Sequence, residues 1–480
     1  MSEGKKRDLR LMHLAVMALL IILFHYLPPI GQITEVGMNV LGIFLAVLYG
    51  WTFCDLLWVS LFGIVAVGFS GAITFPEFLA SSFGSDTVLY MLFLFFFTGM
   101  ISEVGLIDYI ANKIISFKFL NGRPWLFSAF ILIGTYISAA FINMFAAAIV
   151  FWEVLFIVSE RFGFQKKDKY PTLMILGVAM TCAIAGAVMP YKPVPLVILS
   201  TYSELSGVPM DFLKYILFAL PITILITLLF IVIFRFIFRP DLKKLVDISV
   251  DFVDQSKMHL DTRQKAAVGF LVVFILMMVA PSLLPEGSFL SNVLSNLGNT
   301  GIIMLLLIAM FLLKFHGEPM ITMKQLLKHV NYDVWLMMAF VVPFSSVFSG
   351  EATGIRETMV AVMQPLLSGK SEMLFITIAA CVAVVLTNIC NNMVIGAIFT
   401  TLIVTIGSST GMNVAPVIAI LSVAVNLSFA TPAACPNMAM AFGMKDWCRA
   451  GDLYKYGVLS AILCLIFTLV IALPWANIIY

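Results

Sequence analysis

Long apolar stretches separated by short polar segments follow one another along almost the whole chain. Residues 87–100, 216–234 and 458–473 each reach or approach the ~20 apolar residues that an α-helix needs to cross a bilayer. The pattern predicts an all-α polytopic membrane protein. Counting the stretches gives about eleven transmembrane helices, and two further apolar segments are too short to cross the membrane twice.

The composition agrees with a membrane protein. Of the 480 residues, 61% are hydrophobic and only 11% are charged, whereas soluble domains average about 25% charged residues. No polar stretch is long enough for a soluble domain, and no basic patch is interleaved with aromatic residues, so we expect a lipid bilayer and no nucleic acid as partner. Lys5-Lys6-Arg7 precedes an apolar run without a small-residue cleavage site, which predicts a retained first helix within residues 1–33.

The basic residues indicate the orientation of the chain. Most of the 28 Lys and Arg residues fall into six clusters, at residues 5–10, 113–123, 161–169, 235–265, 314–328 and 445–455. The positive-inside rule assigns all six clusters to the cytoplasmic face. We therefore expect a multi-pass protein of the plasma membrane with a cytoplasmic N-terminus and an external C-terminus.

Two segments are expected to enter the membrane and return on the same side. Residues 122–160 lie between two basic clusters, and each arm has only about 16–18 residues, which favours a re-entrant hairpin that opens inward. Residues 372–406 have Arg356 and Lys370 among three acidic residues on one flank and the uncharged residues 407–411 on the other. The charge rule therefore predicts an outward-opening hairpin there. Proline-rich segments then predict broken helices at residues 170–200 and 412–444. The chain is thus expected to be an inverted repeat of residues 34–262 and 263–480.

The two predicted hairpin tips carry the same polar pattern. Ser138-Ala-Ala-Phe-Ile-Asn143-Met144 and Thr387-Asn-Ile-Cys-Asn391-Asn392-Met393 each have a hydroxyl residue, four intervening residues and an Asn-Met pair. Polar side chains within the membrane are costly and normally face a cavity or a protein partner. Their duplication predicts two equivalent halves around one site, as in many secondary transporters.

The broken helices add the chemistry that such a site needs. The first break contains Pro190, Pro193 and Pro195, and the second contains Pro432 and Pro436. Unwound backbone at membrane depth lines cavities, and its carbonyl oxygens suit alkali cations. Helix N-termini attract anions. One scaffold could therefore hold cations behind the two tips and a small anion between them.

At these tips and breaks the chain resembles the divalent anion/sodium symporter family of dicarboxylate, citrate and sulfate transporters, within the wider ion-transporter superfamily. That family carries Ser/Thr-x-x-x-Ser/Thr-Asn-Thr at each tip and a Thr-Pro-Pro-Asn-like break downstream. The resemblance implies alternating access, a homodimer and two sodium sites. It assigns cation binding to these residues: Ser138, Asn143, Gly186, Thr387, Asn391, Asn392 and Ala430. It assigns substrate binding to these: Asn143, Met144, Asn392, Met393, Pro436 and Asn437. Lys192 joins these candidates because of its charge, as described below.

The chain departs from the family pattern at the tips. Ile142 lacks the hydroxyl group that the family uses for a cation, and Asn391 replaces another hydroxyl with an amide. Met144 and Met393 stand where the family has the threonines that contact the substrate carboxylates. These changes favour an anion that is larger or more apolar than a dicarboxylate.

Lys192 is a charged residue inside the first broken segment. A charge near the bilayer centre costs about 2.5–3.5 kcal/mol on insertion scales, so it usually has a partner or a function. One hypothesis is that its ammonium replaces the first-site sodium or binds the substrate anion directly. The alternative is that Lys192 snorkels to the outer surface or pairs with an acidic residue.

These features together predict a secondary active transporter of a small anion, a carboxylate first, coupled to sodium. Sodium is then the only metal and takes the place of a cofactor. A sodium-independent anion exchanger of the same fold is the first alternative. A channel-like or receptor membrane protein and an intramembrane enzyme are alternatives from other classes. No nucleophile–base pair or metal cluster is visible in the sequence, so we do not expect an enzyme.

Overall fold

The computed structural model describes residues 3–245, 259–285, 288–315, 317–348, 350–355, 357–358, 361, 372–389, 391–432 and 434–480. Arg356 and Lys370, which entered the charge argument, lie outside the described residues, as do Cys390 in the second tip and Ala433 in the second break. The described secondary structure is helical apart from one short antiparallel pair, β1 (Lys314–Phe315) and β2 (Glu318–Pro319). The prediction of an all-α polytopic fold is confirmed.

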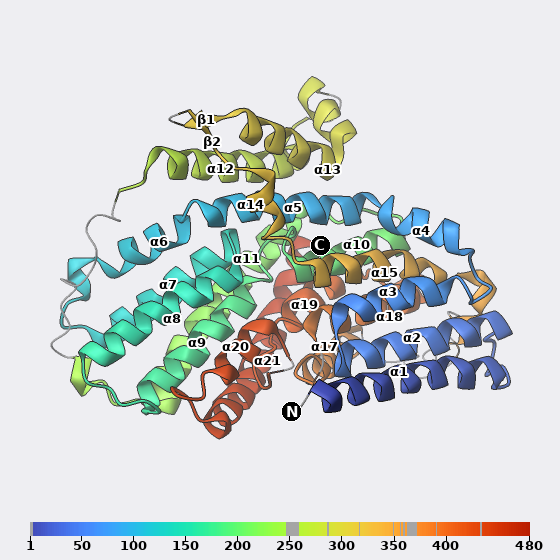
Figure 1. Ribbon diagram of the computed structural model, residues 1–480, viewed down its shortest axis with the longest axis horizontal. Coiled ribbons are helices and arrows are strands. Elements are labelled where there is room, and N and C mark those ends of the chain that lie inside the picture. Colours follow the sequence, from blue (N-terminus) through green and yellow to red (C-terminus); the bar gives the residue numbers. More distant parts are fainter. Residues whose placement is uncertain are drawn as a thin grey trace.

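The helices form two groups that pack mainly within themselves. The group that we call the scaffold contains α1 (Glu3–Tyr26), α2 (Glu35–Phe53), α3 (Leu56–Val67), α4 (Phe75–Phe83), α5 (Asp86–Glu103), α12 (Thr262–Leu283), α13 (Phe289–Leu312), α14 (Met323–Leu327) and α15 (Tyr332–Phe348). Within it, α3 packs on α15 and α13 packs on α5. In Figure 1, α1–α4 form the right-hand side, and α12 and α13 cover the top.

The second group, which we call the core, holds both predicted hairpins and both broken helices. It contains α7 (Pro124–Phe141), α8 (Met144–Arg161), α9 (Lys169–Ala185), α10 (Pro193–Ser206), α11 (Phe212–Val232), α17 (Glu372–Thr387), α18 (Asn392–Thr410), α19 (Ala415–Ala424), α20 (Pro436–Gly443) and α21 (Ala450–Ile479). Helix α6 (Leu106–Ile115) follows α5 and leads into the core, where it packs on α7. Helices α10 and α15 form the largest direct contact between the two groups.

Short helical turns complete the described structure: η1 (Lys118–Leu120), the π-helical η2 (Ile233–Phe238), η3 (Lys243–Leu245) and η5 (Glu351–Thr353). By length and apolar composition, five helices of the described chain could each cross a membrane, at Asp86–Glu103, Pro124–Phe141, Phe212–Phe238, Thr262–Pro281 and Ala450–Ile479. The four hairpin arms have 16–19 residues, and the halves of the broken helices have only 8–17. Short helices of this kind suit segments that end inside the membrane.

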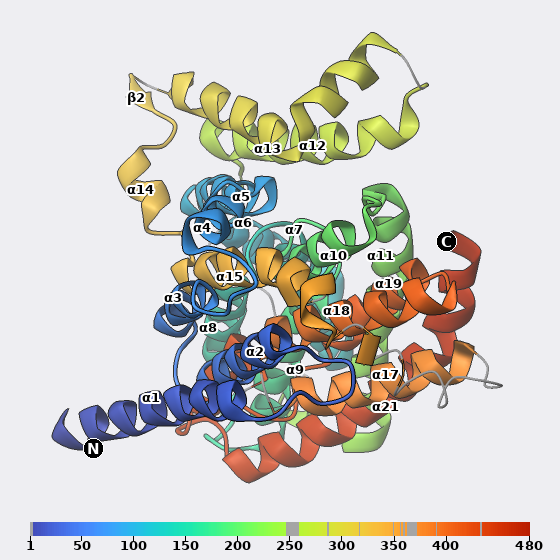
Figure 2. The same cartoon turned by 90° about the vertical axis from the view of Figure 1, so that its right-hand side faces the viewer.

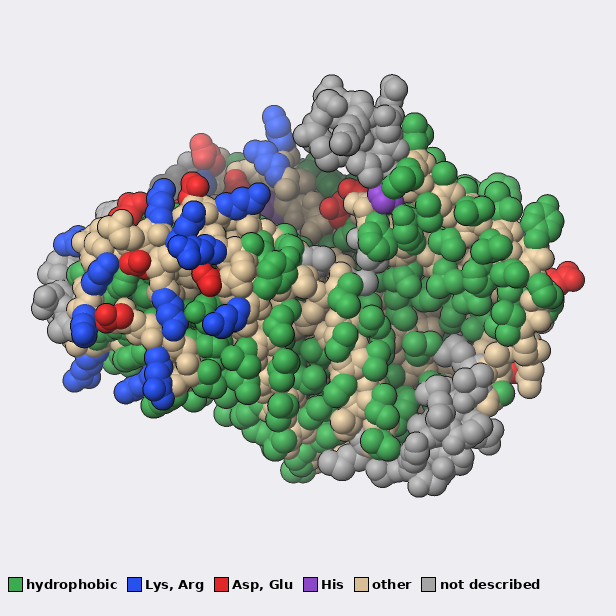
Figure 3. Space-filling model, turned by 90° about the horizontal axis from the view of Figure 1, so that it is seen from below, with side chains coloured by type: hydrophobic (Ala, Val, Ile, Leu, Met, Phe, Trp, Pro, Cys, Tyr) green, Lys and Arg blue, Asp and Glu red, His purple; other side chains and the backbone are tan. Residues whose placement is uncertain are grey.

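Three of the basic clusters meet at one end of the molecule. The backbone N–H of Lys167 donates to the Trp447 carbonyl at 3.0 Å, and the Lys244 ammonium donates to the Gly163 carbonyl at 2.8 Å. The Lys166 ammonium also lies 5.8 Å from the centre of the Trp447 ring. Figure 3 shows Lys and Arg side chains gathered at this end, whereas hydrophobic side chains cover most of the remaining face. Loops that are far apart in the sequence therefore share one side.

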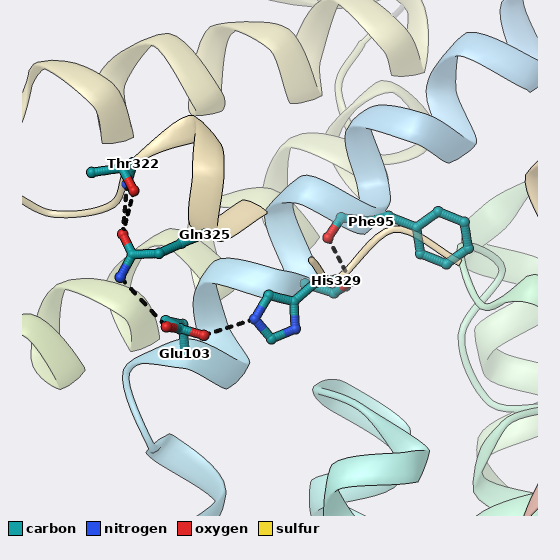
Figure 4. A network of polar contacts seen from close by, with 6 residues as sticks. Phe95, Glu103, Thr322, Gln325 and His329 are labelled. Atoms are coloured by element: carbon teal, nitrogen blue, oxygen red, sulfur yellow. Dashed lines mark hydrogen bonds and ion pairs between the residues drawn. The ribbon is translucent and has the colours of Figure 1, made fainter. Parts of the chain in front are cut away.

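A polar network fixes the segment that enters α15. The His329 Nε2 atom lies 2.8 Å from a Glu103 carboxylate oxygen at the end of α5, and Gln325 donates to the same carboxylate at 3.4 Å (Figure 4). Gln325 also forms a capping box with Thr322 at the start of α14. The network therefore sets the position from which residues 331–334 extend.

Candidate functional site

The first hairpin turns at Asn143, between α7 and α8. The Asn143 Oδ1 atom accepts hydrogen bonds from the backbone N–H groups of Phe145 at 2.9 Å and Ala146 at 3.1 Å. Asparagine is among the best residues for capping a helix N-terminus because its side chain satisfies N–H groups that have no partner within the helix. The cap explains why a polar residue ends the apolar run of the first arm.

The second hairpin turns one residue earlier relative to the shared motif. Its capping residue is Asn391, whose Oδ1 atom accepts from the Met393 N–H at 2.9 Å. Asn392 is instead the first residue of α18. Its amide nitrogen lies 3.5 Å from the Asn426 Oδ1 atom, and its backbone N–H donates to the Ala434 carbonyl at 3.2 Å. The motif aligns Asn143 with Asn392, but the capping role aligns Asn143 with Asn391.

A cavity of about 90 Å³ lies where the two tips and the two breaks meet the scaffold. Its lining includes the first residues of four helices, in the pairs Met144 and Phe145 of α8, Pro193 and Val194 of α10, Asn392 and Met393 of α18, and Pro436 and Asn437 of α20. A water-sized molecule needs only about 10–15 Å³ measured this way. The cavity is therefore large enough for several water molecules or a small solute.

Amides dominate the polar part of this lining. The polar lining side chains, apart from a cysteine, are Asn331, Asp333, Asn391, Asn392, Asn426 and Asn437. Within the described structure, the Asn437 Oδ1 atom is buried without a hydrogen-bond partner. Asp333, which is exposed, is the one charged side chain of the lining, and Lys, Arg and His are missing from the described lining residues.

The structure separates the predicted substrate residues into two sets. Five of them line the cavity: Met144, Asn392, Met393, Pro436 and Asn437. The other two, Asn143 and Lys192, are not among the described lining residues. The side-chain oxygen of Asn143 is occupied by the α8 cap, as described above. Both methionines face the cavity, so the two departures from the family pattern occur at the surface that a solute would touch.

Lys192 binds the first tip. It is the residue that precedes α10, is only 5% exposed, and donates from its ammonium to the Ile142 carbonyl at 2.8 Å. Ile142 is the residue that ends α7. The carbonyl end of a helix carries the negative pole of its dipole, which favours a cation. The alternative that Lys192 snorkels to the outer surface does not fit a buried ammonium.

The other predicted residues of the first cation site lie beside this contact. The Ser138 carbonyl accepts from the N–H groups of Ile142 and Asn143, whereas its buried hydroxyl group has no hydrogen-bond partner in the described structure. A Cβ atom added to Gly186 would lie 3.6 Å from the Met144 sulfur, so the first break passes close to the tip. The tip and the break of the first half therefore meet at Lys192 and Gly186.

Neutral groups join the tip and the break of the second half. The Thr387 hydroxyl donates to the Val425 carbonyl at 2.8 Å. The side chain of Asn388 donates to the Leu427 carbonyl at 2.9 Å and accepts from the Ala430 N–H at 2.7 Å. A hydroxyl group and several carbonyl oxygens thus converge where two helices end, which is the donor set that transporters offer to sodium. The chemistry of this set fits a small alkali cation.

Four polar residues of this region were not predicted from the sequence. Asn388 lies inside the second tip motif, and Asn426 lies two residues before the polar start of the second break, so a search for every amide inside an apolar run would have found both. Asn331 immediately precedes α15, and Asp333 lies in its first turn. Nothing in the sequence distinguishes them from ordinary residues at the start of a helix, because it is the fold that brings them to the cavity.

The comparisons with known proteins agree with a transporter. Residues 46–425 match the profile of the citrate transporter family. An uncharacterized transporter of Haemophilus influenzae is 23% identical over 362 residues, which cover 74% of each chain. The crystal structure of the YdaH transporter of Alcanivorax borkumensis superposes with a TM-score of 0.55 at 12% identity and covers 83% of this chain and 87% of that one, which shows a shared fold.

The matched region spans most of the chain, including both tips and the first break. The resemblance to a family of anion transporters within the ion-transporter superfamily is confirmed at the level of the family. The protein is a multi-pass membrane transporter and belongs to the citrate transporter family.

Proposed function

We propose that this transporter carries a small carboxylate anion together with a coupling cation, sodium first, by alternating access. The core would carry the substrate site, and the scaffold would supply the wall against which the core moves. Citrate is the first anion to test, because the matching family is named for its transport. The anion would occupy the cavity between the two tips.

One observation carries the proposal: four helix N-termini open onto a single cavity. Each N-terminus carries the positive pole of a helix dipole, equivalent to roughly half an elementary charge. Side-chain caps already occupy the N–H groups of Phe145, Ala146 and Met393. The anion would therefore be held by the dipoles and by the side-chain amides of the lining rather than by a fully open ring of backbone N–H groups.

The charges around the cavity favour coupling to a cation. The described lining offers no basic side chain, and Asp333 adds a negative charge. An anion with two or three carboxylates would meet too little positive charge unless a cation entered with it. The oxygen atoms at Thr387, Val425 and Asn388 are a suitable position for that cation.

The proposed topology follows the basic loops. The clusters that meet at one end would face the cytoplasm of a plasma membrane. Helix α21 starts beside one of them at Ala450, and its 30 residues extend about 45 Å, which is enough to end on the opposite, external face. We expect a cytoplasmic N-terminus and, as the family resemblance implies, a homodimer. Cross-linking of single-cysteine variants in membranes would test the homodimer.

Uptake by purified protein in liposomes tests the proposal. Labelled citrate and succinate are supplied outside with a sodium gradient, a potassium gradient or no gradient, and with or without unlabelled anion inside. We expect saturable uptake that requires inward sodium. Uptake that does not saturate would indicate a channel, and the absence of uptake or binding of any carboxylate would refute the proposal.

A sodium-independent anion exchanger is the second candidate. The observation that favours it is the buried ammonium of Lys192 at the first tip, because a fixed positive charge reduces the need for mobile cations. In the same liposomes an exchanger would require internal anion and would ignore the sodium gradient.

A further inference from the structure

The ammonium of Lys192 has an unusual electrostatic environment. It lies at the N-terminus of its own helix α10, where the dipole disfavours a positive charge. Within the described chain, no carboxylate lies within 4.0 Å of it. A buried charge without an ionic partner is strongly unfavourable unless hydrogen bonds and dipoles compensate it. Burying the Lys192 ammonium at this position therefore costs free energy of folding, which indicates a functional role for the residue.

The first tip compensates the charge of the buried Lys192 ammonium. The ammonium donates to the Ile142 carbonyl at 2.8 Å, at the negative end of α7. Two further donor positions of the ammonium remain for nearby acceptors. The buried hydroxyl group of Ser138 is one turn earlier on the same helix and has no hydrogen-bond partner among the described residues. The first tip therefore binds a protein-borne cation through the Ile142 carbonyl, and the Ser138 hydroxyl group one turn away is an unused oxygen.

No equivalent charge joins the described residues of the second tip to those of its break. Its tip and break are joined by Thr387 and Asn388, through neutral hydrogen bonds to Val425, Leu427 and Ala430. The residue that corresponds to Asn388 in the first tip motif is Ala139, which can form none of these bonds. Each tip is thus bonded to its broken helix, but the first tip is held by the charge of Lys192 and the second by amide and hydroxyl groups.

We propose that Lys192 is a tethered cation that permanently occupies the cation position of the first tip, so that only the second tip binds a mobile coupling cation. The inference goes beyond the proposed function because it assigns a stoichiometry and a residue. Only the predicted effect of Lys192 on sodium-coupled uptake rests on the proposed function. Cation binding to the protein without any anion tests it separately.

The first experiment measures the thermal stability of the full-length protein in detergent, without anion, as sodium chloride replaces choline chloride. Removing the side chain in Lys192→Ala leaves both the space and the oxygens of the first tip. The variant should gain a sodium-specific rise in melting temperature that exceeds the wild-type rise, because a ligand that binds only the folded state stabilises it. Lys214→Ala, which removes an exposed lysine of α11, is the matched control and should behave like the wild type.

The second experiment measures uptake in liposomes as a function of sodium concentration. In Lys192→Ala, uptake at low sodium should fall by about tenfold and recover at high sodium, and the Hill coefficient for sodium should rise by about one. Lys192→Arg keeps a positive charge and should retain the wild-type sodium response. Ethylammonium, which resembles the missing end of the side chain, should partly replace sodium in Lys192→Ala.

The outcomes separate the two proposals. An unchanged sodium response of Lys192→Ala in both stability and uptake overturns the tethered cation. So does a weakened affinity for the anion with no change in sodium dependence, since Lys192 would then bind the anion. If Lys192→Ala folds only in sodium, the tethered cation is supported. If Lys192→Ala folds in neither salt, Lys192→Arg decides: a sodium response that differs from the wild type overturns the tethered cation. A wild type that transports no carboxylate refutes the proposed function but leaves the stability test of Lys192 valid.

Discussion

The two hairpin tips share a sequence motif and a position beside the cavity, but they are attached to their broken helices in opposite ways. In the first half, Lys192 reaches from the break to the tip carbonyl of Ile142. In the second half, Thr387 and Asn388 reach from the tip to the carbonyls and N–H groups of the break. A repeated motif therefore does not imply repeated chemistry: Lys192 lies outside the motif, Asn388 replaces Ala139, and the shared hydroxyl group bonds the break in Thr387 but has no hydrogen-bond partner in Ser138 in the described structure.

The largest effect is expected from Asn388, the residue that joins the second tip to its break. Asn388→Ala leaves the Leu427 carbonyl and the Ala430 N–H without this partner. Hydrogen bonds between membrane helices contribute about 0.6–1.7 kcal/mol each, and unpaired buried groups add to the cost, so we expect a loss of about 2–3 kcal/mol. Thermal unfolding in detergent measures it.

Ser138→Ala is the matched control in the first tip. It removes a buried hydroxyl group that has no hydrogen-bond partner in the described structure, so its cost should lie within about 0.5 kcal/mol of zero. An equal loss of stability in Asn388→Ala and Ser138→Ala would contradict the distinction between the two tips.

The next largest effect is expected on the sodium dependence of uptake, which should differ between variants of the two tips. Thr387→Ala removes a hydroxyl oxygen from the proposed cation site and should raise the sodium concentration for half-maximal uptake by about tenfold, which corresponds to ~1.4 kcal/mol. Thr387→Ser, which keeps the hydroxyl group, should restore the wild-type value. Ser138→Ala should leave the sodium dependence unchanged, because Lys192 occupies its site. Sodium dependences that shift together in Thr387→Ala and Ser138→Ala would mean that both tips bind mobile sodium.

A smaller effect on stability is expected from the residues that cap the two hairpins, and it decides how the two tip motifs should be aligned. Asn143→Ala and Asn391→Ala each remove the side chain that caps the second arm of a hairpin, at an expected cost of about 1 kcal/mol. Asn143→Gly and Asn391→Gly should cost only a few tenths of a kcal/mol, since glycine is tolerated at this position. Melting temperatures of the four variants test this, and Asn392→Ala serves as the comparison. If Asn392→Ala shows the cost expected for a cap and Asn391→Ala does not, the alignment by motif is correct.

Much of this arrangement could be predicted from the sequence because membrane burial leaves a strong signal. Apolar length and proline position predicted the hairpin arms and breaks, and the observed helices Pro124–Phe141, Met144–Arg161 and Asn392–Thr410 lie close to the predicted ranges. A charged residue in an apolar run signals a site, which is how Lys192 was identified, whereas Asn437 was assigned by the resemblance to the family. The direction in which a side chain points carries no such signal. Asn143 turned out to cap a helix instead of lining the cavity.

The scaffold wall of the cavity was the least predictable part. Asn331 and Asp333 reach the cavity because the Glu103–His329 contact and the capping box of Gln325 fix the segment before α15. The Glu103–His329 contact joins residues 226 positions apart in the sequence, and a loop carries no periodic pattern that would reveal it. The cavity lining is asymmetric as well, because Asp333, the one charged side chain of the described lining, belongs to the second half of the chain.

The smallest effect tests this wall charge. Asp333→Asn keeps the shape of the side chain and removes the repulsion between its carboxylate and an anion in the cavity. At ~4 Å in a water-filled site this repulsion amounts to about 1 kcal/mol or less, so the affinity for a carboxylate substrate should rise about threefold. Asp261→Asn is the control, because Asp261 caps α12, asparagine caps equally well, and Asp261 is not among the described lining residues. A fall in affinity in Asp333→Asn alone would mean that the carboxylate holds the coupling cation, and the mobile cation would then bind at the scaffold wall instead of the second tip.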